Sequence, residues 1–448
     1  HCVTRRQRQM CIRDRQTHGP RRVDGDIPNP ANSWKAKAWD YSTSIDAGIP
    51  VGETEQHGLL KDIVGLFHNR YGKLKKILEA ETGVKVTGNI TQVKQNWSDY
   101  TKRVATVIGI VADVRRTKSG GRMVELEDTT NETLTVFVAK EDPAAGTLLP
   151  DDVIGVSGTF NRDGTMFWTN RVQYPDILKT NINKGGSDYD PVSIAFISDI
   201  HIGSKYFMEN EWDKMMKWLN SDDETAHNIK YLVIAGDAVD GIGVYPGQEI
   251  NLAIDDVYDQ YEYVARKLDM LPDHITPILS PGNHDAVRPA EPQPMLEPLI
   301  RQRFNSAIHT GNPGRINLSG IDVLTYHGKG IDDMVPRMAH VTYQKPAEGM
   351  KEILKKRHLA PMWGERNALS PEEEDQMVIE KIPDLFVTGH THAHQMEWYR
   401  GVPLVVSSTF QNETGFMKML GYKPKKGFLS VYNIQNREMR VIAFDGNP

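Results

Sequence analysis

The stretch VSIAFISDIHIG, residues 192–203, predicts the fold of the larger part of the chain. Its first seven residues are mainly apolar, with β-branched and aromatic side chains, which favours a buried strand. Asp199 and His201 come directly after that run. Because residues two apart in an extended segment point the same way, the carboxylate and the imidazole can converge on one point. Such a pair alone is more often structural than functional.

The same arrangement, an apolar run followed by polar residues, occurs four more times. Expected strands at residues 231–235, 275–279, 321–326 and 385–388 are followed by Gly236-Asp237, Gly282-Asn283-His284-Asp285, His327-Gly328 and Gly389-His390-Thr391-His392. Helices are expected near residues 209–219 and 256–268. Alternating strands and helices indicate an α/β sandwich, and open α/β sheets bind ligands at the carboxyl ends of their strands.

The residue types in these motifs favour a metal site. Carboxylate, carboxamide and imidazole groups together suit borderline divalent ions such as manganese, iron or zinc rather than calcium. About eight such groups can hold two ions, which clamp a phosphoryl group and activate a water. We therefore expect two divalent cations sharing one bridging carboxylate, with Mn²⁺ as the first choice and Fe, Zn or Mg as alternatives.

Residues 84–180 show a different pattern, typical of a small β-barrel. Short segments alternate between apolar and polar residues at 105–111, 122–127, 133–138 and 153–160, with turn-forming residues between them. The order predicts a barrel of the oligonucleotide-binding type. Basic and aromatic side chains could line a groove for single strands: Arg115, Arg116, Lys118, Arg122, Phe160, Phe167 and Trp168. Aromatic residues in barrels are more often core, so both interpretations stay open.

The remaining segments complete the expected division of the chain. Residues 27–83 should be partly helical, because apolar side chains recur at helical spacing: Leu60, Ile63, Phe67, Tyr71, Leu74 and Leu78. Residues 181–190 are an expected linker, and residues 191–448 form the sandwich. Residues 1–26 contain seven arginines without apolar periodicity. A basic DNA-binding arm and a disordered or non-native leader both remain open for that tract.

Composition excludes several classes of protein. The 448 residues are 39% hydrophobic and 25% charged, as in soluble multidomain proteins. No run approaches the roughly 18 apolar residues of a membrane span. The two cysteines, Cys2 and Cys11, lie at the start, so metal binding must use His, Asp and Asn, and a reducing cytoplasm is expected. The net charge of -6 argues against a uniformly basic surface but allows a local basic groove.

The polar motifs resemble those of the calcineurin-like phosphoesterases over roughly residues 190–435. The resemblance implies a four-layered α/β/β/α sandwich. It implies one ion held by Asp199, His201, Asp237 and His392, and a second held by Asp237, Asn283, His327 and His390. His284 would stabilise the transition state or protonate the leaving oxygen, oriented by Asp285. Protein phosphatases of this superfamily have Arg and Glu where this chain has Gly241 and Asp285, which disfavours a phosphoserine substrate.

Several stretches, with a barrel ahead of the sandwich, resemble the small subunits of archaeal family D DNA polymerases. They are FISDIHIGSK (196–205), GDAVDGIGVYPGQE (236–249), PGNHDAVRPAEPQP (281–294) and HLAPMWG (358–364). The resemblance extends from about residue 55 to the C-terminus. It implies a 3′–5′ exonuclease that proofreads for a separate large catalytic subunit, in a heterodimer or larger assembly. The implied ligand is the DNA primer 3′ end or a single strand, and a sliding clamp is a further candidate partner.

Two other functions stay open. The eukaryotic B subunits keep this fold but have lost most metal ligands, so a catalytically silent subunit that bridges to the large subunit is the first alternative. Every ligand position is filled in this chain, which favours an enzyme. The second alternative is an independent nuclease that repairs double-strand breaks, but that type places its capping domain after the phosphoesterase.

Two loops near the expected site allow either a structural or a functional interpretation. Tyr245-Pro246-Gly247-Gln248 is rich in turn-forming residues and either makes a simple turn or shapes a groove for a DNA end. Lysines at 418, 423, 425 and 426 flank Tyr422 and Pro424, and they either contact phosphate or the large subunit, or simply face solvent.

Overall fold

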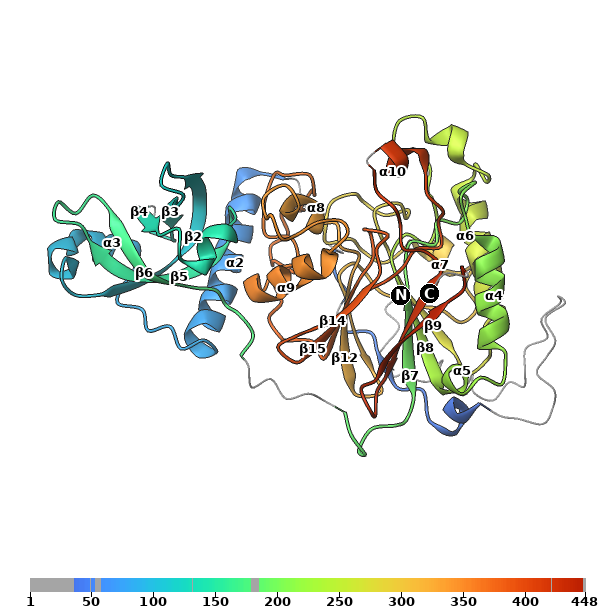
Figure 1. Ribbon diagram of the computed structural model, residues 1–448. Helices are drawn as coiled ribbons and strands as arrows, with labels where there is room; N and C mark the ends of the chain where they lie inside the picture. The colour runs from blue at the N-terminus through green and yellow to red at the C-terminus, as the bar shows by residue number, and fades with distance from the viewer. Residues whose placement is uncertain are drawn as a thin grey trace.

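The computed structural model describes residues 36–48, 50–52, 58–130, 132–178, 185–419 and 421–445. The expectations for residues 1–26, and for residues 181–184 of the linker, lie outside the described residues. Figure 1 shows a small barrel beside a larger sandwich, with a long helix between them. Within the described ranges, no helix combines the length and the apolar character that crossing a membrane requires.

The small body is a closed barrel with the strand order β2-β3-β4-β6-β5. Its strands are β2 (Ala105–Arg116), β3 (Arg122–Glu127), β4 (Thr133–Val138), β5 (Val153–Phe160) and β6 (Phe167–Gln173). The expected limits of β3, β4 and β5 are confirmed. β2 continues past the expected residue 111 because its end pairs with β3 outside the core, where Arg115 and Arg116 are exposed and the apolar alternation is absent. β6 was not expected.

The aromatic residues of the barrel divide between core and surface. Phe160 and Phe167 pack edge to face, with ring centroids 5.1 Å apart, and both are buried in the core. They therefore cannot line a binding groove, which corrects that part of the sequence interpretation. Trp168 is 47% exposed, and Arg116 and Lys118 also face solvent. Arg115 is exposed as well, so any nucleic-acid contact by the barrel would rest on Trp168 and the basic side chains rather than on the phenylalanines.

The large body contains two six-stranded sheets, in the orders β10-β9-β8-β7-β16-β17 and β1-β11-β12-β13-β15-β14. The first contains β7 (Ser193–Ile197), β8 (Ile229–Ala235), β9 (Thr276–Ser280), β10 (Ile308–His309), β16 (Phe428–Asn433) and β17 (Met439–Ala443). The second contains β1 (Ile45–Asp46), β11 (Gly314–Leu318), β12 (Ile321–Tyr326), β13 (Leu385–Thr388), β14 (Gln395–Tyr399) and β15 (Val402–Val406). Strands β7, β8 and β9 are parallel, as are β12, β13 and β15.

Strand β7 shows how the layers form. Ile194 and Phe196 pack between the two sheets, whereas Ala195 and Ile197 pack under helices. Since successive side chains of a strand point to opposite faces, a strand with apolar side chains on both faces must be covered on both. Helices α4 (Glu209–Leu219) and α6 (Val257–Leu268) cover this sheet, and α8 (Ile331–Met334) and α9 (Pro346–Lys356) cover the other. The order of layers is helices, sheet, sheet, helices.

Short helices complete the described chain. They are α3 (Ile90–Gln95), α5 (Glu224–Asn228), α7 (Pro298–Arg301) and α10 (Gly415–Met419), with 3-10 turns at Lys37–Asp40, Trp97–Tyr100, Pro143–Gly146 and Gln248–Asn251. Part of the segment expected to be helical is instead mostly extended: β1 pairs with β11 at the edge of the second sheet. Lys230 Nζ donates to the carbonyl of Ala38 at 3.0 Å, which fixes this segment against the sandwich.

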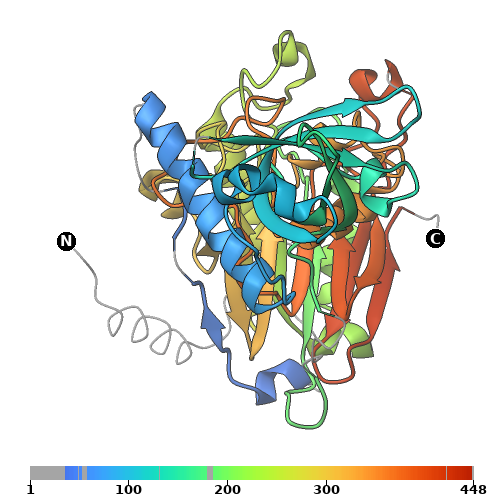
Figure 2. The ribbon, with the colours of Figure 1, turned by 90° about the vertical axis from the view of Figure 1, so that its left-hand side faces the viewer.

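Helix α2 (Leu60–Ala80) joins the two bodies and lies beside the barrel in Figure 2. Tyr71, Leu74 and Leu78 of the expected apolar stripe are buried, but Leu60 is 77% exposed. The same helix buries Arg70 completely, and its Nε lies 2.7 Å from Asp375 Oδ2 of the sandwich. A buried charge is stable only when it is paired, so this contact should fasten the helix strongly.

Candidate metal centre

The side chains predicted to bind metal gather at the carboxyl ends of five strands. Asp199 and His201 follow β7, Asp237 follows β8, Asn283 and His284 follow β9, His327 follows β12, and His390 and His392 follow β13. Three overlapping groups each have ligand atoms within 4.8 Å of one another: Asp199, His201 and His392; His201, Asp237 and His284; and Asp199, Asp237 and His327. The two sheets therefore bring together residues that are up to 193 positions apart in the chain.

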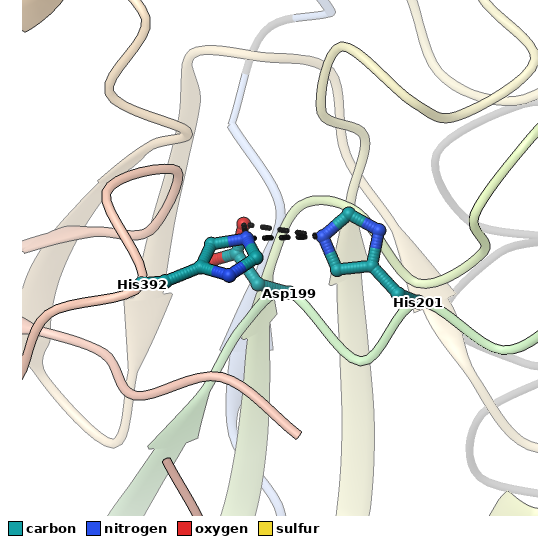
Figure 3. A group of neighbouring side chains, drawn as sticks. All are labelled: Asp199, His201 and His392. Atoms are coloured by element: carbon teal, nitrogen blue, oxygen red, sulfur yellow. Dashed lines mark hydrogen bonds and ion pairs between the residues drawn. The ribbon is translucent and has the colours of Figure 1, made fainter. Parts of the chain in front are cut away.

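Asp199, His201 and His392 form the first group (Figure 3). His392 Nε2 lies 3.3 Å from Asp199 Oδ1 and 3.1 Å from His201 Nε2. Asp199 Oδ1 is buried without a hydrogen-bond partner. Buried polar atoms are nearly always satisfied, and two imidazole nitrogens that face each other beside an unsatisfied carboxylate oxygen form a suitable donor set for a divalent cation. These residues therefore fit an ion at this point.

Asp237 lies between the first group and a second one, which contains His327 and Asn283. Its Oδ2 is 3.8 Å from His201 Nε2 and 3.2 Å from His327 Nε2. On the far side, His327 Nε2 is 3.0 Å from Asn283 Oδ1. Asp237 Oδ2 therefore faces an imidazole on each side.

The position of His390 limits how it could act. Its Nε2 lies 2.9 Å from Asp332 Oδ2, and its backbone N–H donates to Asp199 Oδ2 at 2.9 Å. Its ring centroid is 5.1 Å from that of His327. Although burial lowers the pKa of His390, Asp332 more than offsets this and raises it. Because Nε2 is engaged by Asp332, only Nδ1 could be the ligand atom.

Two other imidazoles are held through the nitrogen that faces away from the centre. His201 Nδ1 lies 3.1 Å from Asp240 Oδ1, and His327 Nδ1 donates to the carbonyl of Ala235 at 2.9 Å. Contacts of this kind fix the orientation of a ligand imidazole and raise its basicity. Both rings thus present Nε2 to the centre.

His284 and Asp285 occupy different environments. His284 Nδ1 donates to the carbonyl of Asp240 at 2.7 Å, and its ring is perpendicular to that of His201, with centroids 4.6 Å apart. Asp285 instead accepts from the backbone N–H of Gly282 at 2.8 Å and from the hydroxyl of Tyr261 at 2.9 Å. The expectation that Asp285 orients His284 is therefore corrected: the Asp240 carbonyl does so. Asp285 fixes the loop because a short carboxylate is satisfied by nearby backbone amides.

The buried charges shift one another's pKa values. Burial raises the pKa of Asp199, but the neighbouring imidazoles, His392 foremost and then His201 and His327, together outweigh it and hold that pKa well below its usual range. Burial opposes charging of His327 and His201, yet Asp237 chiefly raises the pKa of His327 to about 10, and Asp199 chiefly raises that of His201 to about 10. The carboxylates are therefore ionised and stabilise positive charge beside them, which is what a bound cation requires.

Five of these residues have left-handed backbone conformations. The φ angles are 49° for Asp199, 52° for His201, 52° for Asp237, 66° for His390 and 49° for His392. Non-glycine residues rarely adopt φ in this region, and each such conformation costs on the order of 1–3 kcal/mol. The described residues contain ten non-glycine residues with positive φ, and half of them are at this one site. Strain concentrated in this way is typical of a functional centre.

Glycines allow the close approach of the motifs. A Cβ at Gly282 would lie 2.2 Å from Asp237 Oδ1, and one at Gly236, whose φ is 92°, would lie 2.2 Å from His327 Nδ1. Any side chain there would displace a predicted ligand.

Sequence patterns did not reveal the supporting carboxylates. Asp240 lies three residues after Asp237 in a turn, and a search for carboxylates near each motif could have found it. Asp332 lies in α8 and has no periodic signal, because only the packing of α8 brings it to His390.

Substituting Asp240 with Ala should weaken Mn²⁺ binding about 10–100-fold, as is usual when the partner of a ligand imidazole is removed. Asp240 also accepts from Gln411 Nε2 at 3.0 Å, so its loss would release both a ring and a loop. Isothermal titration calorimetry with Mn²⁺ would measure the change. Asp213→Ala, which removes a carboxylate on the surface of α4, is the matched control, and equal affinities in the two variants would contradict the assigned role.

Over residues 194–397 the chain matches the family model for the B subunits of DNA polymerases alpha and epsilon. It is 41% identical over 397 residues to the DNA polymerase II small subunit of Archaeoglobus fulgidus, which covers 87% of this chain and 78% of that protein. Identity is 37% with the protein of the same name from Methanocaldococcus jannaschii, over 91% of this chain and 69% of that one. Identity with the DNA polymerase II small subunit of Halobacterium salinarum is 36%, over 93% of this chain and 81% of that one. The chain therefore belongs to the family of archaeal DNA polymerase II small subunits.

Proposed function

We propose that this chain is a metal-dependent 3′–5′ exodeoxyribonuclease of the calcineurin-like class, which removes nucleotides from DNA 3′ ends for a replicative polymerase. The main support is the convergence of the predicted ligands, five of them strained, at the carboxyl ends of strands from both sheets. A subunit that served only as a scaffold would not require this strain, because backbone outliers persist where function selects them.

The arrangement of elements supports the class of fold. Four layers with parallel strands at the centre suit a calcineurin-like sandwich, assigned here to residues 191–448. A closed five-stranded barrel suits an oligonucleotide-binding domain, assigned to residues 84–180 and preceded by the segment 27–83.

Two divalent ions bound here, Mn²⁺ foremost and Fe, Zn or Mg as alternatives, would activate a water and polarise the scissile phosphodiester. Asp199, His201, Asp237 and His392 would hold one ion, and Asp237, Asn283, His327 and His390 the other. His284 donates through Nδ1 to the Asp240 carbonyl, so Nε2 is the ring atom that can exchange a proton with the leaving 3′ oxygen or stabilise charge on the phosphoryl group.

The family also indicates partners. A small subunit implies a large catalytic subunit, and we propose a heterodimer or larger assembly with it in the cytoplasm, on DNA and near a sliding clamp. Two alternative functions make different predictions. A silent bridging subunit explains the names of the relatives equally well but not the complete ligand set. An independent double-strand-break nuclease would act without the large chain.

The test is incubation of the purified chain with Mn²⁺ and a primer-template carrying a 3′ mismatch, with products resolved on a denaturing gel. We expect stepwise shortening from the 3′ end. EDTA should stop this cleavage because it removes the ions that would activate the water and polarise the phosphodiester. A primer that stays intact both with this chain alone and with the large subunit added would instead establish the bridging role. Cleavage confined to double-strand ends would indicate the repair nuclease.

A further inference from the structure

An exposed apolar loop lies directly beside His284. The Tyr245 ring makes an edge contact with His284, at 6.5 Å between centroids. The loop backbone also packs closely there, since a Cβ at Gly241 would lie 2.2 Å from the carbonyl oxygen of His284. Four apolar side chains of this loop are exposed: Ile242 at 48%, Val244 at 37%, Tyr245 at 37% and Ile250 at 71%. We call these four residues the apolar platform.

The platform is held in place by hydrogen bonds from the buried Gln248 and from Asn251. Gln248 is almost completely buried; its Oε1 accepts from the N–H of Val244 at 2.9 Å, and its Nε2 donates to the carbonyl of Asp240 at 2.8 Å. Asn251 Nδ2 donates to the Tyr245 hydroxyl at 3.2 Å. The apolar surface is therefore pre-organised, which lowers the entropy lost when it binds a ligand.

A basic segment also adjoins the centre, beside His392. The N–H of Lys425 donates to the carbonyl of His392 at 2.8 Å, so residues 421–426 lie next to that predicted ligand. Between positions 412 and 426 the sequence has four lysines and one acidic residue, Glu413. Lys418, Lys423 and Lys425 are exposed. Ring contacts connect this ligand to the platform: His392 neighbours His201, His201 neighbours His284, and His284 neighbours Tyr245.

We propose that the platform binds the base of the terminal nucleotide, with Tyr245 stacked on it, while the lysines bind the phosphate backbone of the same strand. This proposal rests on the nuclease function. A polyanion with exposed aromatic bases complements a centre that has a basic segment and an apolar platform beside it. A base in a duplex is already stacked and paired, whereas a frayed or mismatched base can lie on the platform. The preferred substrate is thus an unpaired DNA end.

Cross-linking tests base binding without requiring catalysis. An oligonucleotide with 5-iododeoxyuridine at its 3′ terminus would be irradiated with the full chain in EDTA, and the attached peptide identified by mass spectrometry. We expect attachment at Tyr245, retained in Tyr245→Phe and lost in Tyr245→Ala. Tyr258→Ala is the matched control, because Tyr258 is also exposed, at 39%, but lies on α6. Attachment elsewhere, for example at Trp168 of the barrel, would overturn the proposal.

Kinetics give a second and separate result. Because stacking on an aromatic residue changes affinity by about tenfold per base, Tyr245→Ala should raise KM for a single strand about tenfold with little change in kcat, and Tyr245→Phe should restore it. A KM equal to that of the unsubstituted chain would contradict the platform. If the unsubstituted chain cross-links at Tyr245 but cleaves nothing, the platform stands and the nuclease proposal fails.

Discussion

Asp237→Asn should reduce the rate of 3′-end cleavage by at least about 10³-fold, since a bound metal contributes several kcal/mol to stabilising the transition state. The asparagine keeps the shape of the side chain. Its Oδ1 can still accept from the backbone N–H of His284, whose nitrogen lies 2.8 Å from Asp237 Oδ1. It lacks the charge that Oδ2 presents to His201 and His327. His284→Ala should give a comparable loss in kcat while Mn²⁺ binding stays close to that of the unsubstituted chain.

The two substitutions are distinguished by single-turnover cleavage together with calorimetric titration of Mn²⁺. Asp213→Asn, on the exposed surface of α4, is the control and should leave both quantities unchanged. Cleavage by Asp237→Asn at the unsubstituted rate would place the chemistry elsewhere in the chain. Weakened Mn²⁺ binding in His284→Ala would make that residue a ligand rather than a proton donor.

Asp375→Asn should destabilise the fold by about 3–5 kcal/mol, because it leaves the buried guanidinium of Arg70 without its counter-charge. Asp375 Oδ2 lies 2.7 Å from Arg70 Nε and 3.0 Å from His358 Nε2. Three segments meet there: α2, the loop after α9, and the loop that carries Asp375. We expect a fall of roughly 10 °C in the thermal midpoint measured by calorimetry. Glu438→Gln, which breaks an exposed pair with Arg440, should leave the midpoint unchanged.

The same carboxylate makes stability depend on pH. Burial raises the pKa of Asp375, but Arg70 and then His358 outweigh it and hold the pKa below its usual range. A group whose folded pKa is depressed stabilises the fold above its unfolded pKa of about 3.9, and that stability is lost as pH falls towards the folded pKa. The thermal midpoints of the unsubstituted chain and of Asp375→Asn should therefore begin to converge as pH falls below about 4. A constant difference down to pH 2 would show that the charge of Asp375 is not what matters.

The sequence by itself determined the strands and the chemistry at their ends. Strands such as β7 and β12 are buried along their whole length and mostly apolar, because burial on both faces favours apolar side chains, so their positions could be predicted without a structure. Asp199 and His201 could be identified because they directly follow such a strand. The role of Asp285 was predicted wrongly because it is adjacent to His284 in the chain, which suggested that the two side chains touch. The carboxylate of Asp285 instead accepts from Gly282 and Tyr261.

Only the tertiary structure decided which distant groups support the site. Asp332 reaches His390 because α8 packs over the second sheet, and Tyr245 lies beside His284 because Gln248 is buried beneath the loop. The two sheets place Asp199 and His392 within 3.3 Å although no local pattern relates them. The physical reason is that periodicity reports whether a residue is buried, while the partner it meets is fixed by how separate elements pack against one another.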